Sequence, residues 1–325
     1  MLLWFSIALA LIFDLLNGYN DSGALTATSI SSHALPPRLA LRLTAIGAFL
    51  GPFLFGVSVA HTIGQGLLTS EGLNLLTIPA ALLAAILWSL ISARLGIPSS
   101  SSHALVGGLV GAALMATGDP SVIQLKGLLK VLLALFLSPL LGFVSGFLFT
   151  RGVYFLARNA TPRINNLFRL LQAITLFGMS LSHGANDAQK SMGLISLALL
   201  LSGAISRFYV PTWVILSCAL AIALGSAFGS QRHIRTLGGR VYRVRPIHGV
   251  ASQLSSALVI ALAAWLGGPV STTHVISSSI IGSGAAERFG KVRWQIAQDM
   301  LLTWLLTIPL TGFFAAAIFW LLQRL

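Results

Sequence analysis

The sequence has very few charged residues for its length. Only 7 of its 325 residues are acidic and 20 are basic, so charged residues make up 8% of the chain. A water-soluble domain carries charge on about a quarter of its residues, most of them on its surface. The composition therefore excludes a soluble globular protein and predicts one whose surface faces lipid.

Cysteine is almost absent as well. The single cysteine, Cys218, stands within an apolar run, which excludes an intrachain disulfide and a metal site built from cysteines. No basic residue precedes the N-terminal run MLLWFSIALALIF, and no small-residue cleavage site follows it. We therefore expect this run to be the first membrane segment rather than a signal peptide.

Long apolar runs take the place of charge. Hydrophobic residues make up 56% of the chain, and the mean hydropathy is +0.88. A membrane-crossing helix needs about 20 apolar residues, so we expect an all-α polytopic membrane protein with about ten to twelve segments. The runs are continuous rather than alternating, which excludes a membrane β-barrel. They cover residues 2–32, 39–68, 73–93, 98–117, 126–157, 167–203, 212–229, 249–267, 269–286 and 296–322.

These runs form two sets of five with the same spacing. We expect a first membrane repeat at 1–157, a polar linker at 158–166 and a second repeat at 167–325, which includes a basic loop at 230–248. Because five is an odd number of crossings, the second repeat enters the membrane from the opposite side. The sequence thus predicts an inverted repeat with broken or half-length helices near the midplane, an architecture of secondary transporters.

The basic residues favour one orientation, because cytoplasmic loops carry an excess of Lys and Arg. With both termini placed outside the cell membrane, fifteen basic residues fall on the cytoplasmic side and four outside. The cytoplasmic set is Arg38, Arg42, Arg94, Arg151, Arg158, Arg163, Arg169, Arg232, Arg235, Arg240, Arg243, Arg245, Arg288, Lys291 and Arg293, and the outer set is Lys126, Lys130, Arg207 and Arg324. This bias accounts for the formal net charge of +13 without a nucleic-acid partner.

Two polar motifs recur, in the same order, in both sets. Gly-Tyr-Asn-Asp at 18–21 matches Gly-Ala-Asn-Asp at 184–187, and Pro-Ser-Ser-Ser-Ser-His at 98–103 matches Pro-Val-Ser-Thr-Thr-His at 269–274. Gly111 then matches Gly282. The repetition of both motifs supports the duplication and marks them as the candidate transport site.

The aspartates of the first motif stand within apolar sequence. An aspartate at bilayer depth costs about 2.5–3.5 kcal/mol, so it needs a cation, a proton or hydrogen-bond donors. The neighbouring asparagines add an amide oxygen and an amide donor. We predict that the coupling cation, Na⁺ or H⁺, binds at Asp21, Asp187, Asn20 and Asn186. The alternative is that each aspartate caps the helix that follows it.

The second motif places hydroxyl groups at predicted helix starts. Pro98 and Pro269 suit the first turn of a helix, and a helix N-terminus binds anions through free N–H groups and its dipole. Two such ends facing each other would bind a tetrahedral oxyanion. The predicted substrate-binding residues are Ser100, Ser101, Ser102, Ser271, Thr272, Thr273, Asn20, Asn186, Gln189 and Lys190. The alternative is that the hydroxyls join helices together.

Three further side chains stand beside these motifs. His103 and His274 end the hydroxyl motifs and are candidate substrate ligands, with packing as the alternative role. Lys190 follows Asp187 by three residues and has no counterpart in the first copy, where Ala24 stands. Its charge can pair with Asp187 or with an anionic substrate.

The two motifs resemble those of the inorganic phosphate transporter family, often called PiT, whose marks are G-x-N-D and P-x-S-T-T-H in each half. The run Ser-His-Gly-Ala-Asn-Asp-Ala-Gln-Lys-Ser-Met-Gly at 182–193 is similar to its short prokaryotic branch. The resemblance covers the whole chain and implies symport of phosphate with Na⁺ or H⁺, no cofactor and a homodimer. A cytoplasmic PhoU-like accessory protein is a further candidate partner.

Two departures from the family pattern leave alternatives open. The first hydroxyl motif has serines where the family has threonines, and Ser-Gly-Ala-Leu follows Asp21 where the family often has Ala-Asn, which leaves the coupling ion open. Some relatives resemble sulfate permeases, so sulfate is the alternative substrate; two carboxylates favour phosphate, which can donate a hydrogen bond. An intramembrane hydrolase would need one asymmetric triad, whereas the polar residues here form two symmetric sets. A passive pore is usually lined by symmetric subunits, whereas this repeat lies within one chain. Both alternatives are therefore less favoured than a transporter.

Overall fold

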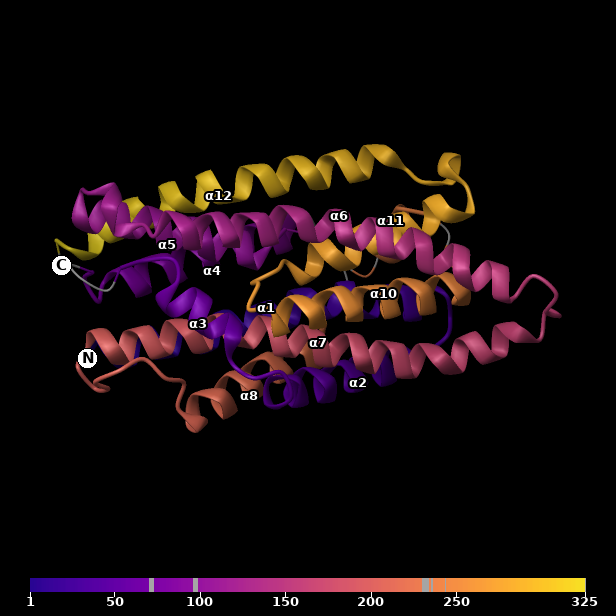
Figure 1. The fold of residues 1–325 in the computed structure, drawn as a ribbon, viewed down its shortest axis with the longest axis horizontal. Helices are drawn as coiled ribbons and strands as arrows, with labels where there is room; N and C mark the ends of the chain where they lie inside the picture. Colours follow the sequence, from indigo (N-terminus) through magenta and orange to yellow (C-terminus); the bar gives the residue numbers. More distant parts are fainter. Residues whose placement is uncertain (70–72, 96–98, 230–233, 235, 243, 325) are drawn as a thin grey trace.

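The fold is a bundle of long helices that run along one common direction (Figure 1). A computed structural model describes residues 1–69, 73–95, 99–229, 234, 236–242 and 244–324. In this part of the chain the only β pairing is an isolated bridge between Leu68 and Ile123. The prediction of an all-α membrane protein is therefore confirmed.

Long and short helices follow one another in the same order in both halves. The first half comprises α1 (Leu2–Ser31), α2 (Pro37–Leu50), α3 (Ser58–Gln65), α4 (Thr77–Leu95), α5 (Ser101–Thr117) and α6 (Leu125–Leu156). The second half comprises α7 (Ile164–Leu201), α8 (Thr212–Phe228), α10 (Pro246–Trp265), α11 (Thr272–Glu287) and α12 (Trp294–Leu322), with a short π-helical turn, η3 (Thr236–Arg240), before α10.

The two halves run in opposite directions. Both termini lie at one end of the bundle, and the turn between α6 and α7 lies at the other, so α1 opposes α7 and α6 opposes α12 (Figure 1). The helices also exchange partners: α6 packs along α11 and α12 along α5, while α8 packs along α1 and α2 along α7. This arrangement is the expected inverted repeat.

Two helical hairpins reach toward the middle of the bundle from opposite ends. In the second half, Glu287 at the end of α11 forms an ion pair with Arg245, just before α10, and the two helices pack together, so α10 and α11 fold back on each other. In the first half, α4 and α5 pack together in the same way. The tips of the hairpins meet, because Ser102 Oγ at the start of α5 donates to the Val270 carbonyl just before α11, at 2.9 Å.

This hairpin arrangement corrects one detail of the charge count. Arg94 lies one residue before the end of α4, close to the hairpin tip, and not at the end of the bundle to which the sequence assigned it. The apolar run at 73–93 does not cross and leave on the far side; it turns back through α5. Three other arginines of the predicted cytoplasmic set, Arg232, Arg235 and Arg243, lie outside the described residues.

Fewer helices span a membrane by length than the ten to twelve segments that the apolar runs predict. Within the described residues, five helices are long and apolar enough: α1, α4, α6, α10 and residues 297–322 of α12. The bent pair formed by 37–53 and 58–65 raises the number to six. α5 and α11 have 17 and 16 residues, about 24–26 Å at 1.5 Å per residue, which is short of the ~30 Å hydrocarbon layer. The apolar composition of a segment does not distinguish such shorter helices from helices that cross the whole membrane.

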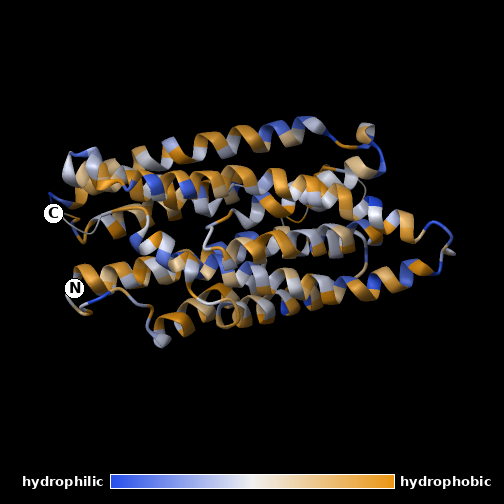
Figure 2. Ribbon diagram, viewed as in Figure 1, coloured by the Kyte–Doolittle hydropathy of each residue, from blue (hydrophilic) through white to orange (hydrophobic). Residues whose placement is uncertain are grey.

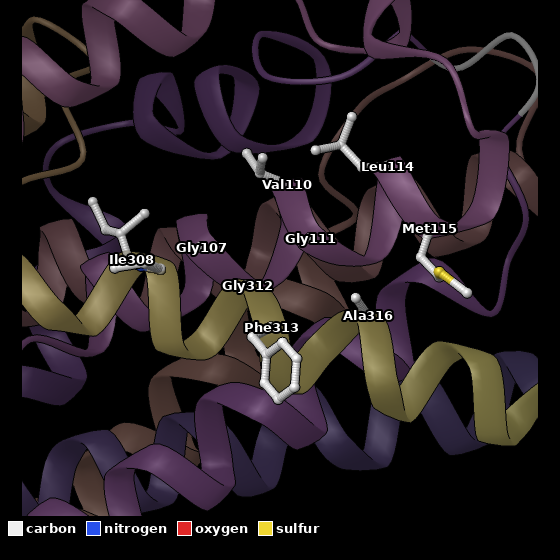
Figure 3. A pocket seen from close by; sticks show the side chains of 10 residues that line it. Gly107, Val110, Gly111, Leu114, Met115, Ile308, Gly312, Phe313 and Ala316 are labelled. Carbon is white, nitrogen blue, oxygen red and sulfur yellow. The ribbon is translucent and has the colours of Figure 1, made fainter.

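Hydrophobic residues predominate along most of the helices, whereas hydrophilic residues mark the turn between α6 and α7 and the loop before α12 (Figure 2). An apolar groove of about 470 Å³ runs between α5 and α12 (Figure 3). Gly107, Gly111 and Gly312 line it, so these helices approach each other closely enough for backbone contact. Such small-residue contacts are typical of helix packing in membranes.

Candidate functional site

The Asn-Asp motifs lie inside α1 and α7, two long helices that pack against each other. Asp21 stands in α1, which continues to Ser31, and Asp187 stands in α7, which continues to Leu201. Neither aspartate is at a helix start, so the alternative that they act as helix caps is wrong. Both carboxyls are buried, with Asp187 fully so.

The hydroxyl motifs do begin helices, one residue before the first helical turn. Ser100 caps α5 by accepting from the His103 N–H at 3.1 Å, and Ser271 caps α11 by accepting from the His274 N–H at 3.3 Å. The expectation that proline occupies the first turn is wrong for Pro269, which precedes the cap by two residues, because the capping serine takes the boundary position instead. Pro98 lies outside the described residues.

The N-terminus of α11 brings its two threonines between the aspartates. Thr272 Oγ1 lies 3.1 Å from Asp21 Oδ2 and 3.0 Å from Asp187 Oδ2. Thr273 Oγ1 forms a short hydrogen bond with Asp21 Oδ1. One helix end thus joins the carboxyls of both repeats.

The Thr272 hydroxyl cannot satisfy both carboxylates, because a hydroxyl has one hydrogen to donate. It lies within hydrogen-bond distance of two carboxylate oxygens and can donate to only one of them. The other contact brings the hydroxyl oxygen against a carboxylate, which a proton on one carboxyl or a cation between the oxygens would stabilise. The geometry of the described atoms is therefore that of a site for one added positive charge.

Asp187 already has a positively charged partner. Lys190 Nζ lies 2.6 Å from Asp187 Oδ1, and both side chains are fully buried. On the other carboxylate oxygen, Oδ2, Asn17 Nδ2 donates at 2.9 Å. The ammonium thus neutralises Asp187, whereas Asp21 contacts two hydroxyls, a histidine and the Asp187 carboxyl itself.

His183 lies on the same face of α7, one turn before Asp187. Its Nδ1 is 3.5 Å from Asp187 Oδ2, 4.0 Å from Asp21 Oδ2 and 3.4 Å from Thr272 Oγ1. One ligand atom each from Asp21, His183 and Asp187 lie within 4.8 Å of one another, and all three residues are buried. These three side chains are spaced closely enough to surround a single cation.

The other predicted site residues have different contacts. The Asn186 amide binds the loop before α11, donating to the Gly268 carbonyl at 3.0 Å and accepting from the Val270 N–H at 3.3 Å. Gln189 Oε1 accepts from the Val59 and Ala60 N–H groups at the start of α3. Both amides position backbone segments around the site in this structure.

The other motif residues of the first repeat, and the two motif histidines, lie in the same region. Asn20 is half-buried beside Asp21, and Ser101 is half-buried at the first position of α5. His103 and His274 are buried and in contact, with ring centroids 4.7 Å apart, and His274 also stacks on Trp304 at 3.7 Å. The histidines therefore join the two hairpin tips.

Three residues near the site escape the motif analysis: Asp14, Asn17 and His183. Asp14, Asn17 and Asp21 are spaced by three and four residues, which places them on one face of α1. His183 precedes Asp187 by the same interval that separates Asn17 from Asp21. That helical periodicity, applied to polar residues in an apolar helix, is the signal that could have found them.

Comparison with known proteins decides the family. The model of the phosphate transporter family matches residues 17–315. The chain belongs to the phosphate transporter family. A probable low-affinity inorganic phosphate transporter of Rhizobium meliloti is 42% identical over 95% of this chain and 93% of its own, and one of Bacillus subtilis is 42% identical over 97% and 96%. The resemblance inferred from the motifs is thus confirmed.

A solved structure supports the same assignment at the level of the fold. The chain is similar to a protein described as the sodium-dependent phosphate transporter, with a TM-score of 0.89, 25% sequence identity and coverage of 100% of this chain and 99% of that one. The chain is accordingly a multi-pass membrane transporter of inorganic phosphate and not an enzyme.

Proposed function

We propose that the protein couples the uptake of inorganic phosphate to a cation, Na⁺ or H⁺, and that it works by alternating access in the cell membrane. The observation that carries this proposal is that one hydroxyl, Thr272 Oγ1, lies within hydrogen-bond distance of both the Asp21 and the Asp187 carboxyl. A buried carboxylate without a counter-charge is costly within a bilayer. The sodium dependence of the structural relative supports a coupling cation in this fold.

The cation binds between the two repeats. Asp21 Oδ2, Asp187 Oδ2 and His183 Nδ1 face one another there, and Thr272 Oγ1 lies within 3.4 Å of all three atoms. Lys190 pairs with the other oxygen of Asp187 and balances its negative charge. One monovalent cation or one proton is then enough to balance the negative charge of Asp21. Asn20 and Asn186, next to the aspartates, complete the predicted cation-coupling set.

Phosphate binds next to this cation, between the starts of α5 and α11. The first N–H groups of a helix have no partner within the helix and favour an anion, and here two helix starts meet at the contact between Ser102 and Val270. Ser101, Ser102, Thr272 and Thr273, at the first two positions of these helices, are the proposed hydroxyl donors. The bound cation attracts the anion, so each ligand raises the affinity for the other.

Alternating access follows from the two hairpins. The α4–α5 hairpin enters from the end that carries the termini, and the α10–α11 hairpin enters from the opposite end (Figure 1). Movement of one hairpin tip away from the other opens the site toward one end at a time. Both termini are proposed to lie outside, since most basic residues gather at the other end.

The assembly and the accessory partner are also proposals. The family resemblance implies a homodimer, and a PhoU-like protein at the cytoplasmic end is a further partner. The mass of the purified protein in detergent or nanodiscs tests the dimer. Co-purification with a PhoU-like protein tests the accessory partner.

Reconstituted transport tests the coupling. Purified protein in proteoliposomes should accumulate labelled phosphate under an imposed Na⁺ or H⁺ gradient, and Asp21→Asn should abolish accumulation while sparing exchange of internal for external phosphate. Asp299→Asn, which changes an exposed carboxyl on α12, is the matched control. Accumulation by Asp21→Asn at the wild-type level would contradict the proposed cation site, and stronger competition by sulfate than by unlabelled phosphate would favour the alternative anion.

A further inference from the structure

A third acidic residue lies near the transport site and has no role in the coupling described above. Asp14 stands on α1, seven residues before Asp21, and is fully buried. Seven residues are two helical turns, so Asp14 lies on the same face of the helix, nearer the end of the bundle that carries both termini. Its Oδ1 accepts a hydrogen bond from Ser191 Oγ at 2.6 Å.

The surroundings of Asp14 do not neutralise a negative charge. Its second oxygen, Oδ2, is buried and has no hydrogen-bond partner among the described residues. The described ion pairs do not include Asp14, and Lys190, the nearest cation, holds Asp187 instead. A carboxylate buried in this way is unstable as an anion.

The charged and titratable groups around Asp14 come from two helices. α7 contributes Asp187 and Lys190, and α8 contributes the buried Cys218 thiol beside it. The other elements packed along α1 are α2, α4, α10, α11 and η3, and their charged and titratable groups include Arg38, Arg42, Arg94, His248, His274 and Glu287. None of these groups is among those that act most strongly on Asp14.

We propose that Asp14 is a proton-binding site, separate from the cation site at Asp21, and that its proton takes part in phosphate transport. A metal cation fits poorly there, because one carboxylate and one hydroxyl provide few oxygen ligands. A proton needs only the carboxyl itself. Oδ2 can carry the proton while Oδ1 still accepts the hydrogen bond from Ser191. The inference rests on the proposed coupling and adds a second ion to it.

The position of Asp14 links its charge to the transport site in two ways. Lys190 acts electrostatically on Asp14 as well as pairing with Asp187, so an ionised Asp14 competes with Asp187 for the lysine ammonium. Asn17, one turn after Asp14 on the same face of α1, donates to Asp187, and Asp14 and Asp187 also interact electrostatically. Protonation of Asp14 therefore favours the state in which Lys190 pairs with Asp187, and by reciprocity that state favours protonation.

The first test measures the proton itself rather than transport. In infrared difference spectra of the purified protein in lipid, a buried protonated carboxyl gives a C=O stretching band that disappears when the group ionises. We expect this band to be lost in Asp14→Asn and retained in Asp299→Asn, the exposed control. A band unchanged in Asp14→Asn would overturn the proposal.

The second test counts protons in transport. Reversal potentials in proteoliposomes with opposed phosphate and pH gradients should show one proton fewer per phosphate for Asp14→Asn than for the wild type. The ionisation of phosphate itself changes with pH, but it is the same for both proteins, so the difference isolates Asp14. Ser191→Ala should retain the wild-type proton count and shift only its pH dependence.

The outcomes separate this inference from the proposed function. A wild type that shows no gradient-driven accumulation under any cation contradicts the coupling as a whole. A wild type that is driven by a gradient, with an unchanged proton count in Asp14→Asn, leaves the coupling intact and assigns Asp14 a structural role. If Asp14→Asn does not fold, Asp14→Glu, which keeps the ionisable group, should restore both folding and the proton count, and a Glu variant that folds without it overturns the inference.

Discussion

At the scale of single residues, Thr272 is the side chain on which the two repeats depend most directly. Its hydroxyl lies between Asp21 Oδ2 and Asp187 Oδ2. Thr272→Val keeps the branched shape and removes the donor. A hydrogen bond to a charged group contributes about 1.5–3 kcal/mol, so we expect roughly a ten- to hundred-fold loss in cation affinity for phosphate uptake.

The matched control for Thr272 is Thr311→Val. Thr311 is also a fully buried helical threonine, but its hydroxyl bonds only to backbone carbonyls of its own helix, of which the Thr307 carbonyl is the nearer at 2.7 Å. Cation dependence of labelled phosphate uptake should be unchanged in this variant. Equal losses in both variants would mean that the Thr272 hydroxyl serves helix packing.

The residues that the sequence predicts well are those with a repeated pattern. Asp21, Asp187 and the threonines of α11 were identified because the same motif occurs twice, and the structure places their side chains together. Contacts that cross between helices without a repeat, such as Asn17 to Asp187 or Gln189 to the start of α3, depend on helix rotation and packing. A single sequence contains no direct information on those rotations.

At the scale of helices, one pair of matching glycines sets how closely the half-length helices approach their neighbours. A Cβ on Gly111 of α5 would lie 2.1 Å from the Gly312 carbonyl oxygen of α12, and a Cβ on Gly282 of α11 would lie 2.1 Å from the Phe143 carbonyl oxygen of α6. The backbones therefore touch at equivalent places in both repeats. The sequence match of Gly111 with Gly282 thus has a direct structural meaning.

Alanine at either glycine should destabilise the protein, because the neighbouring carbonyl is backbone and cannot move alone. We expect Gly111→Ala and Gly282→Ala to lower the melting temperature in detergent by several degrees, in line with the usual 1–3 kcal/mol cost of overpacking. Gly178→Ala is the control, since a Cβ there has no neighbour within 4 Å and alanine favours a helix. A melting temperature that stays the same in all three variants would contradict the close approach.

The hairpins mark the limit of prediction from apolar runs. The runs at 73–93 and 98–117 have the length and composition of ordinary spans, yet α4 and α5 fold back at the middle of the bundle. What distinguishes them is the capping serine and the polar tip, which bind another helix rather than water or lipid headgroups. Composition gives the apolar length of a segment but not the partner at its end.

At the scale of the whole molecule, the inverted repeat was predictable because it follows from the order of the motifs and an odd number of crossings. The half-length hairpins do not change this result, since each enters and leaves at the same end and so preserves the parity. The structure accordingly places both termini at one end and the turn between α6 and α7 at the other (Figure 1). Which end faces the cytoplasm depends on the distribution of basic residues.

Side-specific labelling tests that orientation, and the shortage of cysteine makes the experiment clean. Cys218 is fully buried, so the wild-type chain should not react with a membrane-impermeant maleimide. Arg324→Cys, near the C-terminus, should react in intact cells, whereas Arg158→Cys, just after α6, should react only after permeabilisation; both positions are exposed. The expected difference follows from the excess of arginine around the α6–α7 turn, because basic residues are retained on the cytoplasmic side. The opposite labelling pattern would reverse the orientation while preserving the fold, and labelling of both positions from one side would contradict the inverted repeat itself.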